Sequence, residues 1–141
     1  MKKTAVIYWS GTGNTKAMAE AVLEGMKEAG ADAALLEPGD VNGSTLSGVD
    51  AVAFGCPAMG SEVLEESEFE PMFDGCKSSI GGKRVALFGS YGWGDGEWMR
   101  SWEKSCDDAN INLFTESVIC CEAPDDDALA ACTAMGKALA E

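Results

Sequence analysis

The sequence predicts an α/β protein with a doubly wound, five-stranded parallel sheet and helices on both faces. Five short apolar runs alternate along the chain with amphipathic patterns of helical period, which is typical of repeated strand–helix–strand units. Most of these runs lack the two-residue alternation of a half-exposed strand, so we expect both of their faces to be buried. Right-handed crossovers then make the strands parallel. The length of 141 residues predicts one domain, spanning residues 1–141.

Each expected element has its own local signal. Helical spacing of apolar residues predicts a first helix over residues 14–29, with Gly30 as its C-cap, a short acidic helix over 64–73 and a third helix over 96–106. Three acids at 125–127 suit the start of a last helix, which continues to the C-terminal region. The polar segment 37–50 is expected to be a connection with one turn near 44–46. The expected strands are Val6–Trp9, Ala33–Leu36, Ala51–Phe54, Val85–Phe88 and Val118–Cys121.

The composition narrows the possible partners. Twenty-four acidic against ten basic residues give a net charge of −14, which argues against binding nucleic acid or an anionic membrane and favours basic protein surfaces. No apolar run approaches the roughly 20 residues that span a bilayer. The run after Lys2 and Lys3 ends at Ser10, so we expect no targeting segment and a cytoplasmic location.

The residue types also limit the chemistry. The chain has no histidine, which excludes Ser-His and Cys-His catalysis and histidine-based zinc sites. Its six cysteines form no C-x-x-C pair and do not match ferredoxin spacings, so we expect reduced thiols, several of them in the core, and no metal. Cys120 and Cys121 are adjacent in an expected strand and should point to opposite faces.

The first strand leads directly into a loop suited to a phosphate. This loop combines two glycines, which permit a close backbone approach, with hydroxyl groups and the N-terminus of the first helix, where free N–H groups favour an anion. The spacing matches neither a Walker A loop nor the dinucleotide G-x-G-x-x-G motif, because position 16 is Lys. A terminal monophosphate therefore fits best. An ordinary capped turn is the alternative reading. The loop residues are Ser10, Gly11, Thr12, Gly13, Asn14 and Thr15.

Two further loops follow the third and fourth expected strands. Each begins with a Phe-Gly strand end and then places a large side chain among small residues, Met59 in one loop and Trp93 in the other. Either residue alone would be read as core. As a pair at neighbouring strand ends, they suit the two faces of a planar ring. The loops contain Pro57, Ala58, Met59, Gly60, Ser61 and Glu62, and Ser90, Tyr91, Gly92, Trp93, Gly94 and Asp95.

These three loops, in their order and spacing, resemble those of the short-chain flavodoxins of anaerobic bacteria, and the resemblance covers essentially the whole chain. It implies the sheet order 2-1-3-4-5 and one non-covalently bound FMN. By this resemblance, residues 10–15 and Ser90 hold the phosphate and ribityl end, while Met59 and Trp93 flank the isoalloxazine ring. Glu62 would meet the ring N3–H, and the backbone carbonyl of Gly60 would turn toward N5 on reduction.

The resemblance implies a low-potential one-electron carrier that cycles mainly between the semiquinone and the hydroquinone of FMN, and not an enzyme. The expected partners are redox proteins with basic docking surfaces, such as reductases and hydrogenase- or pyruvate-oxidoreductase-type enzymes, and a monomer is expected. Six acids and no base between Ser61 and Asp74 suit such docking, although a solvated helix face explains them too. A small FMN-dependent reductase of the same fold is the alternative function. A receiver-type signalling module is less suited, because Tyr8-Trp9-Ser10 ends the first strand where acids would be needed.

Overall fold

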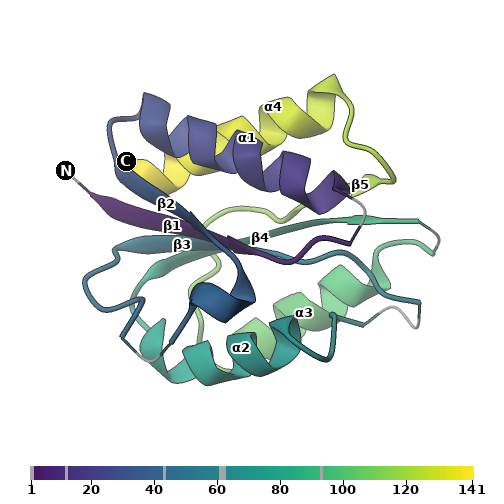
Figure 1. Cartoon of the computed structure of the whole chain (residues 1–141), viewed down its shortest axis with the longest axis horizontal. Coiled ribbons are helices and arrows are strands. Elements are labelled where there is room, and N and C mark those ends of the chain that lie inside the picture. The colour runs from purple at the N-terminus through teal and green to yellow at the C-terminus, as the bar shows by residue number, and fades with distance from the viewer. Residues whose placement is uncertain (1, 12, 43, 61–62, 93) are drawn as a thin grey trace.

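The structure is a computed structural model that describes residues 2–11, 13–42, 44–60, 63–92 and 94–141 (Figure 1). Five strands form one parallel sheet in the order β2-β1-β3-β4-β5, which confirms the predicted fold class and strand order. All five expected strands are present, with ends that differ by up to three residues. Their bounds are β1 Lys3–Tyr8, β2 Asp32–Leu36, β3 Ala51–Gly55, β4 Arg84–Tyr91 and β5 Val118–Cys121.

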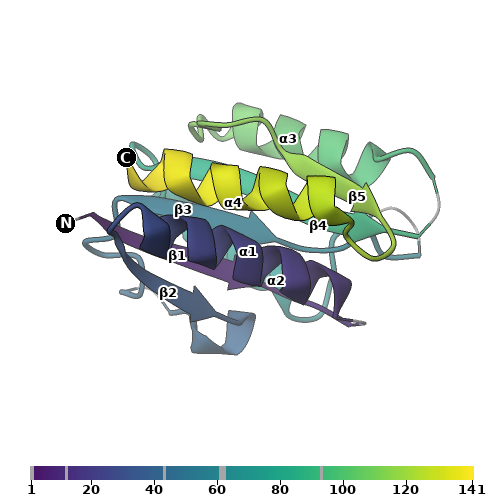
Figure 2. The same cartoon turned by 90° about the horizontal axis from the view of Figure 1, so that it is seen from above.

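Helices cover both faces of the sheet. Helices α1 (Asn14–Glu28) and α4 (Asp126–Ala140) lie side by side on one face, and α2 (Phe69–Cys76) and α3 (Glu97–Asp108) lie on the other (Figures 1 and 2). Two short 3₁₀ turns, η1 (Pro38–Asp40) and η2 (Lys77–Ser79), follow β2 and α2. The carboxylate of Asp125 accepts a hydrogen bond from the backbone N–H of Ala128 at 2.8 Å, so the predicted acidic start of α4 is a side-chain cap.

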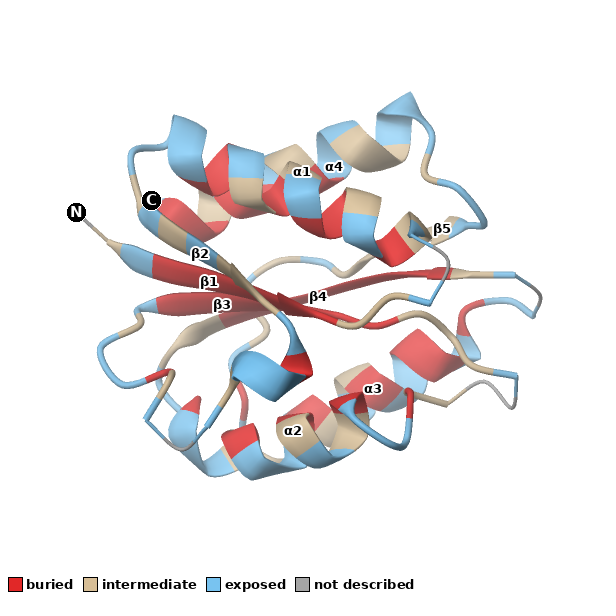
Figure 3. Ribbon diagram, in the orientation of Figure 1, coloured by how far each residue is buried: buried red, intermediate tan, exposed pale blue. Residues whose placement is uncertain are grey.

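The core is divided into two layers by the sheet. Strands β1, β3 and β4 are buried along most of their length, as Figure 3 shows, and they contribute side chains to both layers. One layer lies under α1 and α4. The other, under α2 and α3, contains an edge-to-face aromatic cluster of Phe54, Phe69, Phe73 and Trp102. The expectation of two buried faces is wrong for β2 and β5, because each is an edge strand whose residues are at least partly exposed.

The helices follow the predicted pattern except at the C-terminal end of α1 and at the start of α2. Helix α1 ends at Glu28 and its C-cap is the exposed Ala29, and the predicted cap Gly30 follows with φ +89°. The apolar positions of α3 are buried against the sheet, as the helical spacing predicts: Trp98, Met99, Trp102 and Cys106. Helix α2 begins at Phe69 and not near residue 64, because a buried carboxylate from Glu65 caps the chain just before it.

Helices α1 and α4 approach each other through two glycines. A Cβ atom at Gly25 would lie 2.0 Å from the carbonyl oxygen of Thr133, and one at Gly136 would lie 2.0 Å from the carbonyl oxygen of Val22. Such distances leave no room for a methyl group against rigid backbone. The two helices therefore pack backbone to backbone, and this fixes how α1, and the loop that precedes it, sits on the sheet.

We expect Gly136→Ala to lower the free energy of unfolding by about 2 kcal/mol or more, because the added methyl must push α4 away from α1. Urea unfolding followed by far-ultraviolet circular dichroism measures the change. Gly75→Ala is the matched control. It lies in α2, and a Cβ there meets nothing within 4 Å. That variant should be neutral or stabilised by about 0.5–1 kcal/mol. Equal stabilities of the two variants would contradict the close packing.

Candidate functional site

The site lies where the central strands end. Tyr8 pairs with Gly55, and Gly55 pairs with Phe88, so β1, β3 and β4 reach the same level of the sheet. The loops that follow them enclose a cavity of about 510 Å³ at the carboxyl edge, as parallel α/β sheets generally do. The loops after β1, β3 and β4 are therefore brought together as predicted. The described residues that line the cavity are Trp9, Gly11, Asn14, Pro57, Ala58, Met59, Gly60, Ser90, Tyr91, Gly92 and Glu122.

The loop after β1 directs backbone donors toward one point. The Ser10 hydroxyl oxygen accepts hydrogen bonds from the backbone N–H groups of Gly13 at 3.0 Å and Lys16 at 3.3 Å. The N–H groups of Gly11, Asn14 and Thr15 have no hydrogen-bond acceptor among the residues that the structure describes. The start of α1 thus offers two N–H groups that meet at the Ser10 hydroxyl and three more without a described acceptor, and such donors suit a phosphate.

A buried hydroxyl pair joins this loop to β4. Thr15 and Ser90 are 1% and 5% exposed, and their hydroxyl oxygens lie 3.3 Å apart. Ser90 also accepts a hydrogen bond through its carbonyl oxygen from the N–H of Ala58 at 3.0 Å. Ser90 therefore contacts both Thr15 at the start of α1 and the loop after β3.

The loop after β3 is held at its base and open at its tip. The N–H of Met59 donates to the carbonyl oxygen of Val63 at 2.9 Å, which closes a turn with Gly60 inside it. Beneath the loop, the indole N–H of the buried Trp98 donates to the carbonyl oxygen of Cys56 at 3.1 Å. A Cβ at Gly60 would meet no described residue within 4 Å, so there is room beside this residue where a side chain would be.

Two lining residues were not among the predicted site residues. Trp9 follows β1, and its position immediately before Ser10 could have indicated it. Glu122 follows β5 with φ +59°, a left-handed conformation that is uncommon for a residue other than glycine and often marks functional loops. Its N–H donates to the carbonyl oxygen of Tyr91 at 2.6 Å. Local sequence patterns do not indicate this conformation.

Several predicted residues do not line the described cavity. Ser10 accepts a hydrogen bond from Gly13, and the Thr15 hydroxyl contacts that of Ser90, which does line the cavity. Gly94, with φ +84°, is not among the described lining residues. Thr12, Ser61, Glu62 and Trp93 lie outside the described residues.

A buried carboxylate organises the approach to α2. Glu65 is 6% exposed and accepts hydrogen bonds from the N–H groups of Ser67, Glu68 and Phe69 at 2.7–2.9 Å and from the Ser67 hydroxyl. Burial raises the pKa of Glu65, but these four donors outweigh it and lower the pKa to about 2. One of the six acids in the predicted docking segment is therefore a structural cap, neither a solvated nor a docking residue.

Burial raises the pKa of five cysteine thiols, so none of these five is activated as a thiolate. All six are free, and four are buried. Burial raises the pKa of the Cys56 thiol, beneath the site, to about 12, so this group stays neutral. Cys120 lies within 3.6 Å of the Met18 sulfur, whereas Cys121 is exposed, which fits the expected opposite faces. Among the described residues, no group of three or more His, Cys, Asp or Glu is placed to hold a metal ion.

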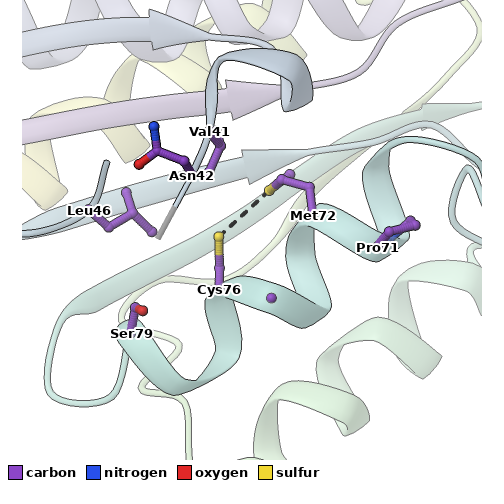
Figure 4. Close-up of a pocket in the computed structure, with 8 residues that line it drawn as sticks. Val41, Asn42, Leu46, Pro71, Met72, Cys76 and Ser79 are labelled. Carbon is purple, nitrogen blue, oxygen red and sulfur yellow. Dashed lines mark hydrogen bonds between the residues drawn. The ribbon is translucent and has the colours of Figure 1, made fainter. Parts of the chain in front are cut away.

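A second cavity of about 220 Å³ lies beside α2, away from the predicted loops (Figure 4). It is lined by Val41, Asn42, Leu46, Pro71, Met72, Gly75, Cys76 and Ser79. The Cys76 and Met72 sulfurs are 3.7 Å apart, and burial raises the pKa of Cys76. None of the predicted site residues lines this cavity.

The fold and the site together define a class of protein. This class is defined by a doubly wound sheet, by N–H donors at the start of α1 and by a cavity at the switch point between β1 and β3. These features are suited to a mononucleotide that carries a terminal phosphate and a planar ring. In the part of the chain that the structure describes, no helix is both long and apolar enough to cross a membrane.

Comparison with known proteins identifies the family. The flavodoxin family model matches residues 6–136. The chain is 46% identical to a flavodoxin of Clostridium beijerinckii over 135 residues, which cover 96% of this chain and 97% of the relative. It is 42% identical to a flavodoxin of Megasphaera elsdenii over 136 residues, with coverage of 96% and 97%. The solution structure of the two-electron reduced Megasphaera elsdenii flavodoxin superposes with a TM-score of 0.89 at 42% identity, covering 97% and 98% of the two chains.

The chain belongs to the flavodoxin family. Members of this family are electron-transfer proteins that bind FMN, and they are not enzymes. The family predicted from the three loops is thereby confirmed, as are electron transfer and FMN over the reductase and receiver alternatives.

We expect Glu65→Gln to lower the free energy of unfolding by about 2 kcal/mol at pH 7, because the charge-assisted hydrogen bonds are lost. The folded pKa of about 2 lies below the ordinary value of 4.5, so the carboxylate stabilises the fold above pH 4.5 and loses this effect as the pH falls toward 2. Urea unfolding at several pH values between 2.5 and 7 measures both effects. The variant should show a weaker acid dependence than the natural protein.

Glu66→Gln serves as the control, because Glu66 is exposed on the same segment. It should stay within about 0.5 kcal/mol of the natural protein. An acid dependence that is the same in Glu65→Gln and in the natural protein would show that Glu65 does not stabilise the fold through its charge.

Proposed function

We propose that this cavity holds FMN non-covalently and that the protein, a monomer of one domain over residues 1–141, carries single electrons at low potential. The observation that supports this most directly is the convergence of backbone N–H groups at the start of α1 beside the cavity at the sheet edge. When bound, FMN supplies a ring that accepts and releases electrons one at a time.

The phosphate end of the cofactor would be held by neutral groups. The N–H groups of Gly11, Asn14 and Thr15, which have no acceptor among the described residues, favour an anion there together with the dipole of α1. The hydroxyls of Thr15 and Ser90 are already oriented by their mutual contact. The Ser10 hydroxyl can exchange its present donors for the phosphate, because a phosphate oxygen is an acceptor of the same kind.

The ring end would lie between the other two loops. Met59 lines the cavity from the loop after β3, and Tyr91 and Gly92 line it from the end of β4 and the residue that follows. We propose that Met59 and Trp93 flank the two faces of the ring and that Glu62 accepts from its N3–H. These two assignments for Trp93 and Glu62 rest on the family resemblance alone.

Gly60 would distinguish the redox states of the cofactor. It lies inside the turn closed by Met59 and Val63, and no described residue is packed where its side chain would be. We propose that the Gly60 carbonyl turns to accept a hydrogen bond from the flavin N5–H, which exists only after reduction. Glycine makes this rotation inexpensive, because it tolerates positive φ.

The surroundings disfavour negative charge on the ring. The described lining residues include no Lys or Arg and one acid, Glu122, and the whole chain carries −14. With FMN bound, these residues would leave a negatively charged, fully reduced ring without a compensating positive charge, and its potential would therefore be lowered. The protein should thus separate the two one-electron steps and act as a strong donor when fully reduced.

A redox titration followed by absorbance tests the function. The natural protein should show two separated one-electron steps, and a single two-electron step would contradict the proposal. Gly60→Val should bring the potentials of the two one-electron steps closer together, because a β-branched residue resists the rotated peptide. Gly39→Ala, at another glycine with open space, should leave both potentials unchanged. An unaltered separation in Gly60→Val would refute the role of Gly60 while leaving the carrier function intact.

The acidic segment beside the site is the proposed docking surface. Of its described acids, Glu66, Glu68 and Asp74 are exposed, Glu70 is partly exposed, and Asp74 pairs with Lys77 at 3.1 Å. We propose that this surface meets basic rims of reductases and of hydrogenase- or pyruvate-oxidoreductase-type enzymes in transient complexes.

The six free cysteines fit a reducing compartment, and we propose that the protein works in the cytoplasm.

Electron transfer from the reduced protein to a basic c-type cytochrome should slow as the salt concentration rises from about 10 mM to 500 mM, because salt screens the attraction. Stopped-flow absorbance measures the rate. Ferricyanide is the control, because an anionic acceptor should react faster as salt rises. If the two acceptors respond to salt in the same way, electrostatic docking is excluded.

A further inference from the structure

Glu68 joins the acidic segment to the wall of the cofactor cavity. The indole N–H of Trp9 donates a hydrogen bond to the Glu68 carboxylate at 3.0 Å, and Trp9 lines the cavity beside Gly11. We propose that Glu68 is a positioning residue that holds Trp9 in place as part of the FMN site. This inference rests on the proposed function, since it assigns a further role at the same site.

Trp9 is fixed at three points. Its backbone N–H donates to the carbonyl oxygen of Gly55 at 3.0 Å, which continues the pairing of β1 with β3. Its six-membered ring lies over Gly11, where a Cβ atom would be only 3.2 Å from Cη2. The Glu68 carboxylate holds the opposite side of the indole. Of these three contacts, only the one to Glu68 comes from a side chain, so it is the one that substitution can remove cleanly.

Glu68 is itself held firmly although it is exposed. Its backbone N–H donates to the Glu65 carboxylate at 2.7 Å, and the next residue, Phe69, donates to the same oxygen at 2.8 Å. Phe69 is fully buried and packs edge-to-face on Trp102. The backbone of Glu68 is therefore anchored to the core through Glu65 and Phe69, and from this fixed backbone its carboxylate reaches the Trp9 indole.

The role of Glu68 in holding Trp9 can be distinguished from the effect of its negative charge on FMN binding. An anionic cofactor phosphate is repelled by every nearby carboxylate, so removing a charge should tighten FMN binding if charge alone matters. If Glu68 acts by holding Trp9, then losing its acceptor oxygen should weaken FMN binding despite the charge removed. The two explanations therefore predict opposite changes in FMN affinity when the Glu68 carboxylate is removed.

Three variants test this, with FMN release measured by the rise in flavin fluorescence when the holoprotein is diluted. Glu68→Ala should raise the FMN dissociation constant by about tenfold, as the loss of a charge-assisted hydrogen bond implies. Glu68→Gln keeps an acceptor oxygen and should restore binding to within about threefold of the natural protein. Glu66→Gln removes a neighbouring exposed charge and should not weaken binding. Tighter binding in Glu68→Ala, or equal weakening in Glu68→Gln, would overturn the proposal.

The hydrogen bond between Glu68 and Trp9 can also be followed directly and in a double variant. The Trp9 indole N–H resonance, assigned by its loss in Trp9→Phe, should shift in Glu68→Ala and stay near its natural position in Glu66→Gln. This readout reports on the hydrogen bond even if FMN is not the ligand, so a failure of the proposed function remains distinguishable. In the Trp9→Phe background, Glu68→Ala should cause no additional loss of FMN. An additional loss of about tenfold there would show that Glu68 acts by another route.

Discussion

The rest of the site depends on the level at which β1 and β3 end beside β4, which itself continues past this level to Tyr91. Their parallel register aligns Tyr8, Gly55 and Phe88 in one row across the sheet. The three following loops consequently leave the sheet at one edge and meet around one cavity. The close contact of α1 with α4 at Gly25 and Gly136 then fixes α1 on the sheet, and with it the N–H groups at its start. Fold and site are positioned by the same backbone contacts.

The acidic segment before and within α2 does more than carry charge. Glu65 is buried and caps the chain, Glu68 binds the Trp9 indole, and Glu66 and Asp74 face solvent. Acids that look alike in the sequence therefore differ in function according to their partners. A docking surface built on this segment is rigid, since the residues between its charges are tied to the core by Glu65 and Phe69.

The fold followed from the sequence because its signals are local or periodic. Apolar runs located all five strands, and capping chemistry located the start of α4. The start of α2 was misplaced because Glu65 resembles a surface helix residue until its burial is known. Trp9 and Glu122 were missed as lining residues because their roles depend on contacts with Glu68 and Tyr91, which are distant in the chain. Close approaches such as that at Gly136 likewise depend on tertiary packing and leave no local pattern.

The way the site would hold a phosphate bears directly on its redox behaviour. A lysine or arginine at the phosphate would bind it strongly, but the same positive charge would stabilise a reduced, anionic ring and raise its potential. The described lining residues instead provide N–H groups and hydroxyls, and their one charged side chain, Glu122, is acidic. Because dipoles at the start of α1 act over a short range, they favour the phosphate without neutralising the field at the distant ring. Neutral recognition of the phosphate is therefore compatible with a strongly reducing flavin, and the −14 net charge of the chain contributes in the same direction.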